Sequence, residues 1–185
     1  MNNVIAIVGM CGVGKSLATE ILEDLNYKKV YFGGVTMDKL RDEGMEVTPE
    51  NEKIMREKLR AEYGMDAYAK ILLPKIYELL VNDNVVLDGL YSWDELKFLK
   101  EKLGESLIVI AVVADKKIRY NRLAVREVRP FSKEETMKRD ISEIENIAKA
   151  GPIAYADYYI ENNNGIEKYK NRLYEILEDI GKKDE

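Results

Sequence analysis

Apolar residues are arranged along the chain in two patterns that alternate. Short continuous apolar runs are typical of strands buried on both faces of a sheet, and five occur, at residues 3–8, 28–32, 85–88, 107–114 and 157–161. Segments with helical spacing fill the intervals, at residues 15–25, 50–63, 66–81, 92–102, 116–126, 133–149 and 166–180. This order predicts a three-layer α/β fold with a five-stranded parallel sheet.

Composition excludes several classes of protein. The chain has 185 residues, 46% of them hydrophobic, with one cysteine and no histidine, which excludes a serine–histidine hydrolase, a histidine-ligated zinc centre and an internal disulfide. No signal pattern or membrane-spanning apolar stretch is found, and the net charge of -5 argues against a broad nucleic-acid interface. We therefore expect a cytoplasmic monomer or homodimer without membrane or nucleic-acid partners.

The stretch "GMCGVGKS", residues 9–16, joins the first predicted strand to the first predicted helix. It satisfies the G-x-x-x-x-G-K-[ST] pattern of a P-loop in the context that this pattern requires. Its glycines let backbone amides face phosphates, Lys15 reaches the β- and γ-phosphates, and Ser16 binds Mg²⁺. The alternative is a glycine-rich turn without a ligand. We expect Lys15 to be exposed when no nucleotide is bound.

The P-loop predicts ATP with Mg²⁺ as the bound ligand and a P-loop NTPase fold for the chain. Eight residues of this segment are expected to contact the nucleotide: Gly9, Cys11, Gly12, Val13, Gly14, Lys15, Ser16 and Leu17. Cys11 lies where a helix N-terminus can make a thiol oxidisable, although a small residue that fills the loop is the simpler interpretation.

Asp88 is the candidate for a second Mg²⁺ site residue. It follows the third apolar run and precedes Gly89, so it should end a strand at the edge of the sheet where ligands bind. An ordinary Asp-Gly turn is the alternative, but the nearby P-loop favours a role in the Mg²⁺ water shell.

The segment "DKKIRYNRLAVREVRP" carries a cluster of arginines, which comprises Arg119, Arg122, Arg126 and Arg129, with Arg139 a little later. Guanidinium groups can stabilise the charge on a transferring phosphoryl group. The alternative is a solvated helix face whose arginines pair with Glu127, Glu134 and Glu135.

Four segments in order, "GMCGVGKS", "DG", "RLAVR" and "ADYYIENNNG", resemble the P-loop nucleoside monophosphate kinases, an adenylate kinase-like group that includes dephospho-coenzyme A kinases. The resemblance spans residues 3 to about 165 and is strongest to a poorly characterised adenylate kinase-related family of archaea and bacteria. It implies that Arg122 lies against the donor adenine and that Arg126 contacts phosphates. It also implies that Arg139 belongs to the lid and that the loop 162–165, with Asn163, lies near the adenine.

The acceptor side departs from this family. "TMDKLRDEG" keeps the spacing of Asp38 and Arg41, so Arg41 is a candidate for the acceptor phosphate and Asp38 for orienting the nucleophile. The arginine that follows the Asp-Gly turn in adenylate kinases is replaced here by Leu90 and Tyr91, which puts AMP in doubt as the acceptor. Replacement cations could come from a pair one helical turn apart, Arg56 and Arg60.

Those two arginines could equally belong to a solvated charged helix. Two tyrosines of the same region, Tyr63 and Tyr68, could stack on an acceptor base, although partial burial between helices is the better interpretation. Trp93 is expected to pack in the interior.

We therefore predict a single kinase domain over residues 1–185, with a core of 1–35 and 82–185, an acceptor-binding helical insertion at about 36–81 and a lid at about 119–139. The predicted reaction is phosphoryl transfer from ATP to a small nucleotide acceptor, a nucleoside or deoxynucleoside monophosphate. Catalysis is assigned to Lys15, Asp88, Arg122, Arg126 and Arg139. A dephospho-coenzyme A kinase is the alternative among enzymes, and a regulatory NTP-binding switch is the alternative from another class.

Overall fold

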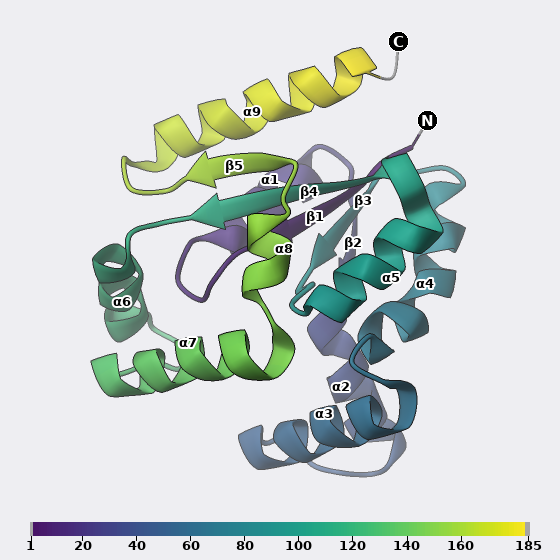
Figure 1. The fold of residues 1–185 in the computed structure, drawn as a ribbon, viewed down its shortest axis with the longest axis vertical. Coiled ribbons are helices and arrows are strands. Elements are labelled where there is room, and N and C mark those ends of the chain that lie inside the picture. The colour runs from purple at the N-terminus through teal and green to yellow at the C-terminus, as the bar shows by residue number, and fades with distance from the viewer. Residues whose placement is uncertain (1, 184–185) are drawn as a thin grey trace.

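The computed structural model describes residues 2–183, and a parallel five-stranded sheet lies at its centre (Figure 1). The strand order is β2-β3-β1-β4-β5. The strands are β1 (Val4–Val8), β2 (Lys28–Tyr31), β3 (Val85–Asp88), β4 (Leu107–Val113) and β5 (Tyr158–Glu161). Each lies within one residue of a predicted strand at both ends, so the predicted sheet is confirmed.

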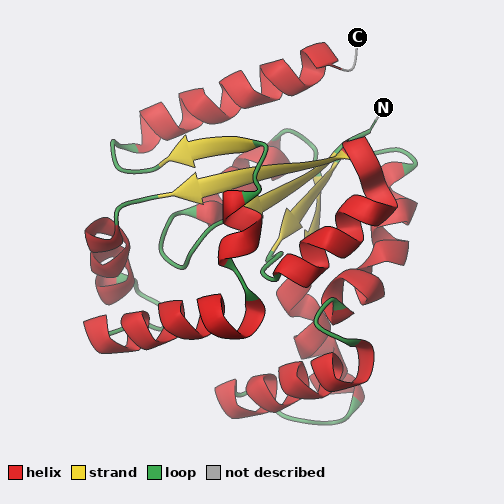
Figure 2. Ribbon diagram, in the orientation of Figure 1, coloured by secondary structure: helices red, strands yellow, loops and turns green. Residues whose placement is uncertain are grey.

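Helices cover both faces of the sheet, which gives the three layers visible in Figure 2. One face carries α1 (Lys15–Asp24) and α9 (Ile166–Lys183). The other carries α2 (Phe32–Asp42), α3 (Pro49–Tyr63), α4 (Ala67–Leu80), α5 (Trp93–Leu103) and α8 (Ala150–Ala154). A short 3-10 helix (Gly104–Ser106) precedes β4. Alternate residues of β1 supply the two cores, since Ile5 and Ile7 face one layer and Val4, Ala6 and Val8 face the other.

Helix α2 was not predicted from the sequence pattern, and the strand before it ends one residue earlier than expected. Its sequence begins with Phe32, Gly33 and Gly34, which are poor helix formers. The helix forms because Phe32, Val35 and Leu40 are buried against the sheet and the neighbouring helices, so tertiary packing outweighs local propensity.

The predicted lid falls in two helices, α6 (Lys116–Val125) and α7 (Lys133–Ile147), and the turn between them. Helix α7 ends two residues earlier than the predicted segment, because Ala148 adopts a left-handed conformation with φ of 49° and caps it. The Lys149 N–H then donates to the Glu143 carbonyl, and the chain turns back into α8. This turn places Lys149 in the interior instead of on the last turn of a helix.

The strand register brings the P-loop to the carboxyl edge of the sheet. Val8 is aligned with Ala111 of β4, and Ile7 is aligned with Asp88 of β3. The chain leaves β1 toward β2 on one side of the sheet and leaves β3 toward β4 on the other side, so the loop after β1 lies where the strand order reverses, which is where parallel α/β sheets bind ligands. Among residues 2–183, no helix combines the length and the apolar character needed to cross a membrane.

Candidate nucleotide-binding site

Glycines determine the path of the loop between β1 and α1. Gly9, Gly12 and Gly14 have φ angles of 147°, 82° and 94°, in the region that favours glycine. A side chain at Gly9 would collide with the Val112 carbonyl, and one at Gly14 would collide with the Asn162 amide. These close approaches explain why the loop requires glycine at these positions.

The Lys15 ammonium group lies against the loop itself. Its Nζ donates to the Gly9 carbonyl at 2.9 Å and to the Met10 carbonyl at 3.2 Å. Lys15 is half-buried, so the expectation of an exposed side chain is wrong. The two loop carbonyls accept the hydrogen bonds that phosphate oxygens could accept from Lys15. Burial, followed by the nearby Lys149 ammonium, lowers the pKa of Lys15 from 10.5 to about 8.

Ser16 and Asp88, the two candidate residues for Mg²⁺, are both near this lysine, since Ser16 follows it in α1 and Asp88 acts on its charge. Asp88 ends β3, and burial raises its pKa although Lys29 and Lys15 oppose that shift. Ser16 is exposed on the first turn of α1. Within residues 2–183, no cluster of three acidic or cysteine side chains could hold a metal by itself. A hydroxyl and one carboxylate nevertheless suit Mg²⁺, which takes most of its ligands from phosphates and water.

Arg119 connects the lid helices to the P-loop, a role that the sequence pattern did not assign to it. It forms a two-pronged ion pair with Asp140 of α7, at 2.7 and 3.1 Å, and donates to the Cys11 carbonyl at 2.9 Å. Arg119 and Asp140 are each 7% exposed. A helix spacing alone cannot reveal such a partner, because Asp140 lies 21 residues away in the chain.

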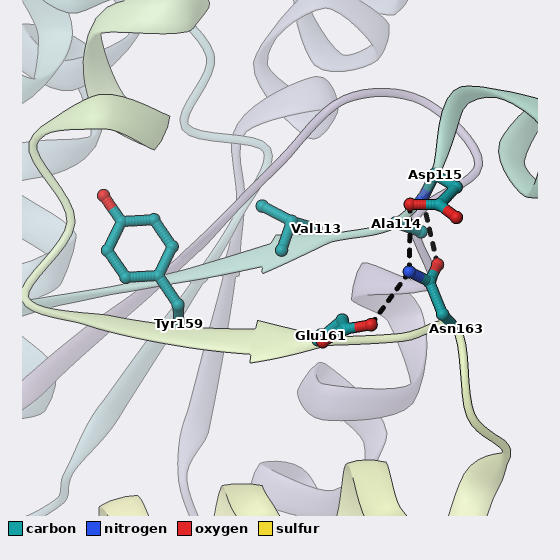
Figure 3. A pocket seen from close by; sticks show the side chains of 6 residues that line it. All are labelled: Val113, Ala114, Asp115, Tyr159, Glu161 and Asn163. Atoms are coloured by element: carbon teal, nitrogen blue, oxygen red, sulfur yellow. Dashed lines mark hydrogen bonds between the residues drawn. The ribbon is translucent and has the colours of Figure 1, made fainter.

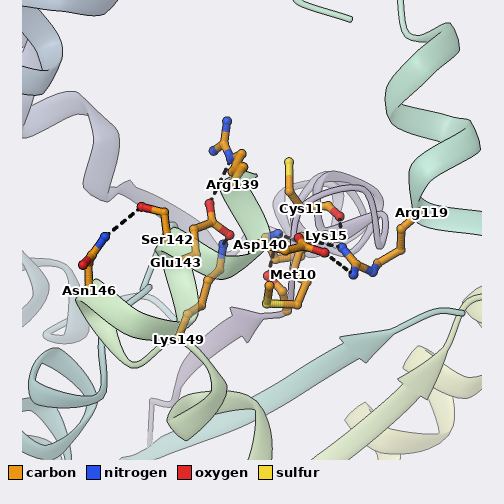
Figure 4. A network of polar contacts seen from close by, with 11 residues as sticks. Met10, Cys11, Lys15, Arg119, Arg139, Asp140, Ser142, Glu143, Asn146 and Lys149 are labelled. Atoms are coloured by element: carbon orange, nitrogen blue, oxygen red, sulfur yellow. Dashed lines mark hydrogen bonds and ion pairs between the residues drawn. The ribbon is translucent and has the colours of Figure 1, made fainter. Parts of the chain in front are cut away.

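A second polar cluster lies beside the loop, on α7 and the turn after it (Figure 4). Glu143 accepts from Arg139 Nε at 3.0 Å and from Lys149 Nζ at 2.6 Å. Lys149 is only 3% exposed, and its Nζ lies 4.4 Å from the centre of the Tyr91 ring. Sequence reasoning missed Lys149, because the left-handed turn at Ala148 carries no glycine signal.

Arg122 holds the loop after β5 against α6. Its guanidinium donates to the Asn162 carbonyl at 2.8 Å, and the Asn162 side chain donates to the Val13 carbonyl at 2.8 Å. The second terminal nitrogen, Nη1 of Arg122, is buried and forms no hydrogen bond within the described residues. Asn162 therefore links Arg122 to the P-loop, and Arg122 keeps an unused buried donor.

Asn163 lies at a pocket of about 520 Å³ at the ends of β4 and β5 (Figure 3). Its amide donates to Asp115 at 3.1 Å and to Glu161 at 2.9 Å, so it bridges the two carboxylates. Val113 and Ala114 supply an apolar wall, and Tyr159 lies across from them. The pocket therefore offers an apolar surface with hydrogen-bond acceptors at one end.

Arg126 is held in the lid, away from the carboxylates proposed for it. Its guanidinium lies 4.5 Å from the centre of the Phe131 ring, and its Nε donates to the Arg129 carbonyl at 2.5 Å. Glu134 pairs instead with Lys138, and Glu135 caps the start of α7. The alternative of arginines paired with these two glutamates is thus wrong.

The candidate acceptor residues are more exposed. Asp38 and Arg41 pair with each other at 2.8 Å on the outer surface of α2. Arg56 pairs with Glu52 at 3.4 Å, and Glu52 also meets Arg129 of the lid at 3.5 Å. Glu52 therefore links Arg129 of the predicted lid to Arg56, one of the two candidate replacement arginines.

Arg60 lies deeper than Arg56 and faces Tyr68. Its guanidinium carbon is 5.8 Å from the centre of the Tyr68 ring, and its Nε is buried without a hydrogen-bond partner within the described residues. Tyr68 is 4% exposed and shares a 2.7 Å hydrogen bond with Thr36, whereas Tyr63 is exposed. Burial of Tyr68 agrees with the packing interpretation. Trp93 also packs, against the ring of Tyr155 at 5.4 Å.

The fold and the loop define the class of protein, a P-loop kinase-like protein. The structure resembles shikimate kinase from Bacteroides thetaiotaomicron, with a TM-score of 0.60 and 14% identity over 97% of this chain and 98% of that chain. It also resembles dephospho-CoA kinase from Campylobacter jejuni, with a TM-score of 0.55 and 18% identity over 97% of each chain. At these identities the likeness concerns the fold, and it confirms the predicted fold class.

The chain belongs to the UPF0200 family. It is 35% identical over 181 residues to the UPF0200 protein of Thermococcus onnurineus, which covers 96% of this chain and 97% of that protein. Residues 5–146 also match the AAA_18 family model, an AAA domain. The likeness in fold to shikimate kinase and dephospho-CoA kinase agrees with the P-loop kinase-like resemblance inferred from the motifs.

Proposed function

We propose that the protein is an ATP-dependent phosphotransferase that acts on a small nucleotide-like acceptor, most simply a nucleoside or deoxynucleoside monophosphate. One observation carries the proposal. The loop lysine Lys15 and the strand-end carboxylate Asp88 lie at the carboxyl edge of the sheet, and Arg139 of α7 is held beside the loop by Glu143. This combination suits a polyphosphate and a metal ion together.

The donor would be held by residues that already form one connected site. Bound MgATP supplies the phosphoryl group and the charge of the metal ion. Lys15 would exchange its two carbonyl partners for phosphate oxygens, Ser16 and Asp88 would serve the metal and its water shell, and the free donor of Arg122 fits the donor nucleotide. Asn163 and the pocket beside it would lie near the base.

Phosphoryl transfer needs little covalent chemistry from the protein, so its residues act by position and charge. Arg139 stands on the helix that Arg119 fixes to the loop, and it would neutralise charge on the transferring group. Arg126 would have to leave Phe131 to do the same, which makes it a residue of the closed lid. On the acceptor side, Asp38 and Arg41 or the deeper pair Arg56 and Arg60 would bind the acceptor.

Two alternatives remain open for the same site. A dephospho-coenzyme A kinase would use a ribose hydroxyl as the acceptor, and the solved structure of such an enzyme shares this fold. A regulatory switch would hydrolyse the nucleotide without any acceptor. The exposed Asp38–Arg41 pair places a guanidinium beside a carboxylate. This pair supports an acceptor with a phosphate, because Arg41 could bind the phosphate while Asp38 faces the nucleophile.

The test is to incubate the purified protein with MgATP and a panel of nucleoside monophosphates, deoxynucleotides and dephospho-coenzyme A, and to identify phosphorylated products by mass spectrometry. We expect one nucleotide to yield a product that the Lys15→Met variant does not form. A product from dephospho-coenzyme A alone would establish the first alternative. Hydrolysis that needs a protein partner and no acceptor would overturn the proposal in favour of the switch.

A further inference from the structure

Lys149 is a buried lysine that the proposed function has not used. It lies in the turn between α7 and α8, and its side chain is 4% exposed. Its ammonium group bonds to Glu143 and lies over the ring of Tyr91, the residue three positions after Asp88. Lys149 is thus placed between the P-loop and the turn that follows β3.

The charges around Lys149 do not balance. Arg139 and Lys149 share the single carboxylate of Glu143, while Lys15 donates to the neutral carbonyls of Gly9 and Met10. Asp140 is already paired with Arg119, and Asp88 acts on Lys15 from a longer distance. Among the described residues, Glu143 is therefore the one carboxylate hydrogen-bonded to any of the three cations Lys15, Arg139 and Lys149, in a partly dry region. Such an arrangement is stabilised by an additional anion between the cations.

The positions of the two lysines indicate which anion fits. Figure 4 shows that Lys15 extends from the P-loop and that Lys149 extends from the side of α7, so the two ammonium groups approach each other. Glu143 keeps Lys149 extended, and the aromatic face of Tyr91 limits its movement. A tetrahedral anion that reaches beyond Lys15 would meet Lys149 and Arg139 next.

We propose that Lys149 is a catalytic residue that binds the terminal phosphoryl group of ATP on the side opposite Lys15, an inference that rests on the proposed function. The buried Glu143 holds Lys149 and Arg139 as a preformed pair of donors, so neither has to be ordered when the nucleotide binds. Lys149 contacts the γ-phosphate and not the β-phosphate, which distinguishes it from Lys15.

A purely structural ion pair between Lys149 and Glu143 makes a different forecast. It would stabilise the fold without regard to which nucleotide is bound. Lys100 provides the control, because its side chain is 27% exposed and its ammonium group also bonds to a carboxylate, that of Asp157 at 3.4 Å. It also bonds to the carbonyl of Leu107 at 2.7 Å, at the start of β4 and therefore at the opposite edge of the sheet from the P-loop.

The test is calorimetric titration of MgATP and MgADP into the full-length protein and the variants Lys149→Met, Lys149→Arg and Lys100→Met. We expect Lys149→Met to weaken MgATP at least about tenfold, as for a lost charged hydrogen bond, and to leave MgADP within about twofold. Lys149→Arg should keep most of the preference for ATP. Lys100→Met should change neither affinity.

The outcomes separate this inference from the proposed function. Equal effects of Lys149→Met on both nucleotides, or no effect on either, together with a lower melting temperature, would show a structural ion pair and overturn the role of Lys149 alone. The Lys149→Arg variant decides the same question if the Met variant does not fold. Failure of the wild-type protein to bind MgATP would instead overturn the proposed function, and this inference with it.

Discussion

The P-loop side and the acceptor side of this protein are built in different ways. Around the P-loop, polar side chains are buried and interlocked, as in the Arg119–Asp140 pair and its bond to the Cys11 carbonyl. On α2 and α3, the candidate residues form exposed pairs, such as Asp38 with Arg41, whose side chains are 69% and 66% exposed. Exposed pairs hold their geometry weakly. The proposed donor site is thus preorganised, whereas the proposed acceptor site would be completed only by its ligand.

This difference explains why the structure supports a donor more sharply than an acceptor. The loop favours a phosphate-containing ligand, because its glycines adopt positive φ angles and the half-buried Lys15 lies against its carbonyls. A surface of charged pairs is compatible with many small anions. The predictions below test first the interlocked region and then the exposed one.

The largest effect is expected at Lys15. Replacement by Met removes the only side-chain cation that the loop itself delivers, so phosphoryl transfer should fall by at least about 10³-fold, measured as product formed with the confirmed acceptor. The fold should be retained, because Lys15 bonds only to loop carbonyls. Full turnover by this variant would show that the loop does not bind the reacting phosphates.

Arg119 tests whether the lid helices are locked to the loop. Arg119→Met leaves the buried Asp140 carboxylate without its partner and should lower the free energy of unfolding by about 3–5 kcal/mol in urea titrations. The double variant Arg119→Met, Asp140→Leu should recover most of that loss. An Arg172→Met control, which removes an exposed pair with Glu175 and one exposed bond to the Tyr159 carbonyl, should change stability by less than about 1 kcal/mol. A small effect at Arg119 would contradict the interlocked description.

The fold was more predictable from the sequence than the site, because strands and motifs are local features whereas the site depends on contacts between distant residues. Strands such as β4 are continuous apolar runs, and the P-loop is a local motif, so both are visible in the sequence. Arg119 and Lys149 depend on partners that tertiary structure brings together, and Lys149 depends further on a left-handed Ala148 that no sequence rule anticipates. Helix α2 was missed because burial of Phe32 and Leu40 outweighs two glycines.

The lid arginines should separate kinetically. Arg126→Ala should lower kcat by about 10²-fold, because Arg126 would meet the phosphates only after it leaves Phe131 and the lid closes. Arg122→Ala should chiefly raise KM for ATP, by the equivalent of about 0.5–2 kcal/mol. Steady-state measurements of kcat and of KM for ATP with both variants test this separation. Near-wild-type kcat for Arg126→Ala would show that this arginine only packs on Phe131.

A smaller, pH-dependent effect follows from Lys15. Burial lowers its pKa to about 8, so the folded protein binds this proton less tightly than the unfolded chain, where the value is 10.5. The free energy of unfolding of the nucleotide-free protein should therefore rise between about pH 8 and 10.5, by up to about 1.4 kcal/mol per pH unit. Below pH 8 both states hold the proton and this contribution is constant.

The same proton should affect nucleotide binding. Phosphate oxygens favour the charged lysine, so affinity for MgATP should fall as pH rises above about 8, by up to about tenfold per unit. Calorimetry in a Cys11→Ser background, which removes the loop thiol, makes the measurement. Lys15→Met should abolish the pH dependence; an unchanged slope in that variant would assign the effect to another group.

The smallest effect on stability is expected on the acceptor side, where it is also the most informative. Arg41→Ala breaks an exposed pair with Asp38 and should change the free energy of unfolding by less than about 1 kcal/mol. If Arg41 binds the acceptor phosphate, the same variant should raise KM for the acceptor about tenfold or more while KM for ATP stays within twofold. Arg60→Met provides the comparison, because its Nε is buried beside Tyr68 without a partner. If the KM for the acceptor changes in the Arg60 variant and not in the Arg41 variant, the acceptor binds beside Arg60 of α3 and not on the exposed surface of α2.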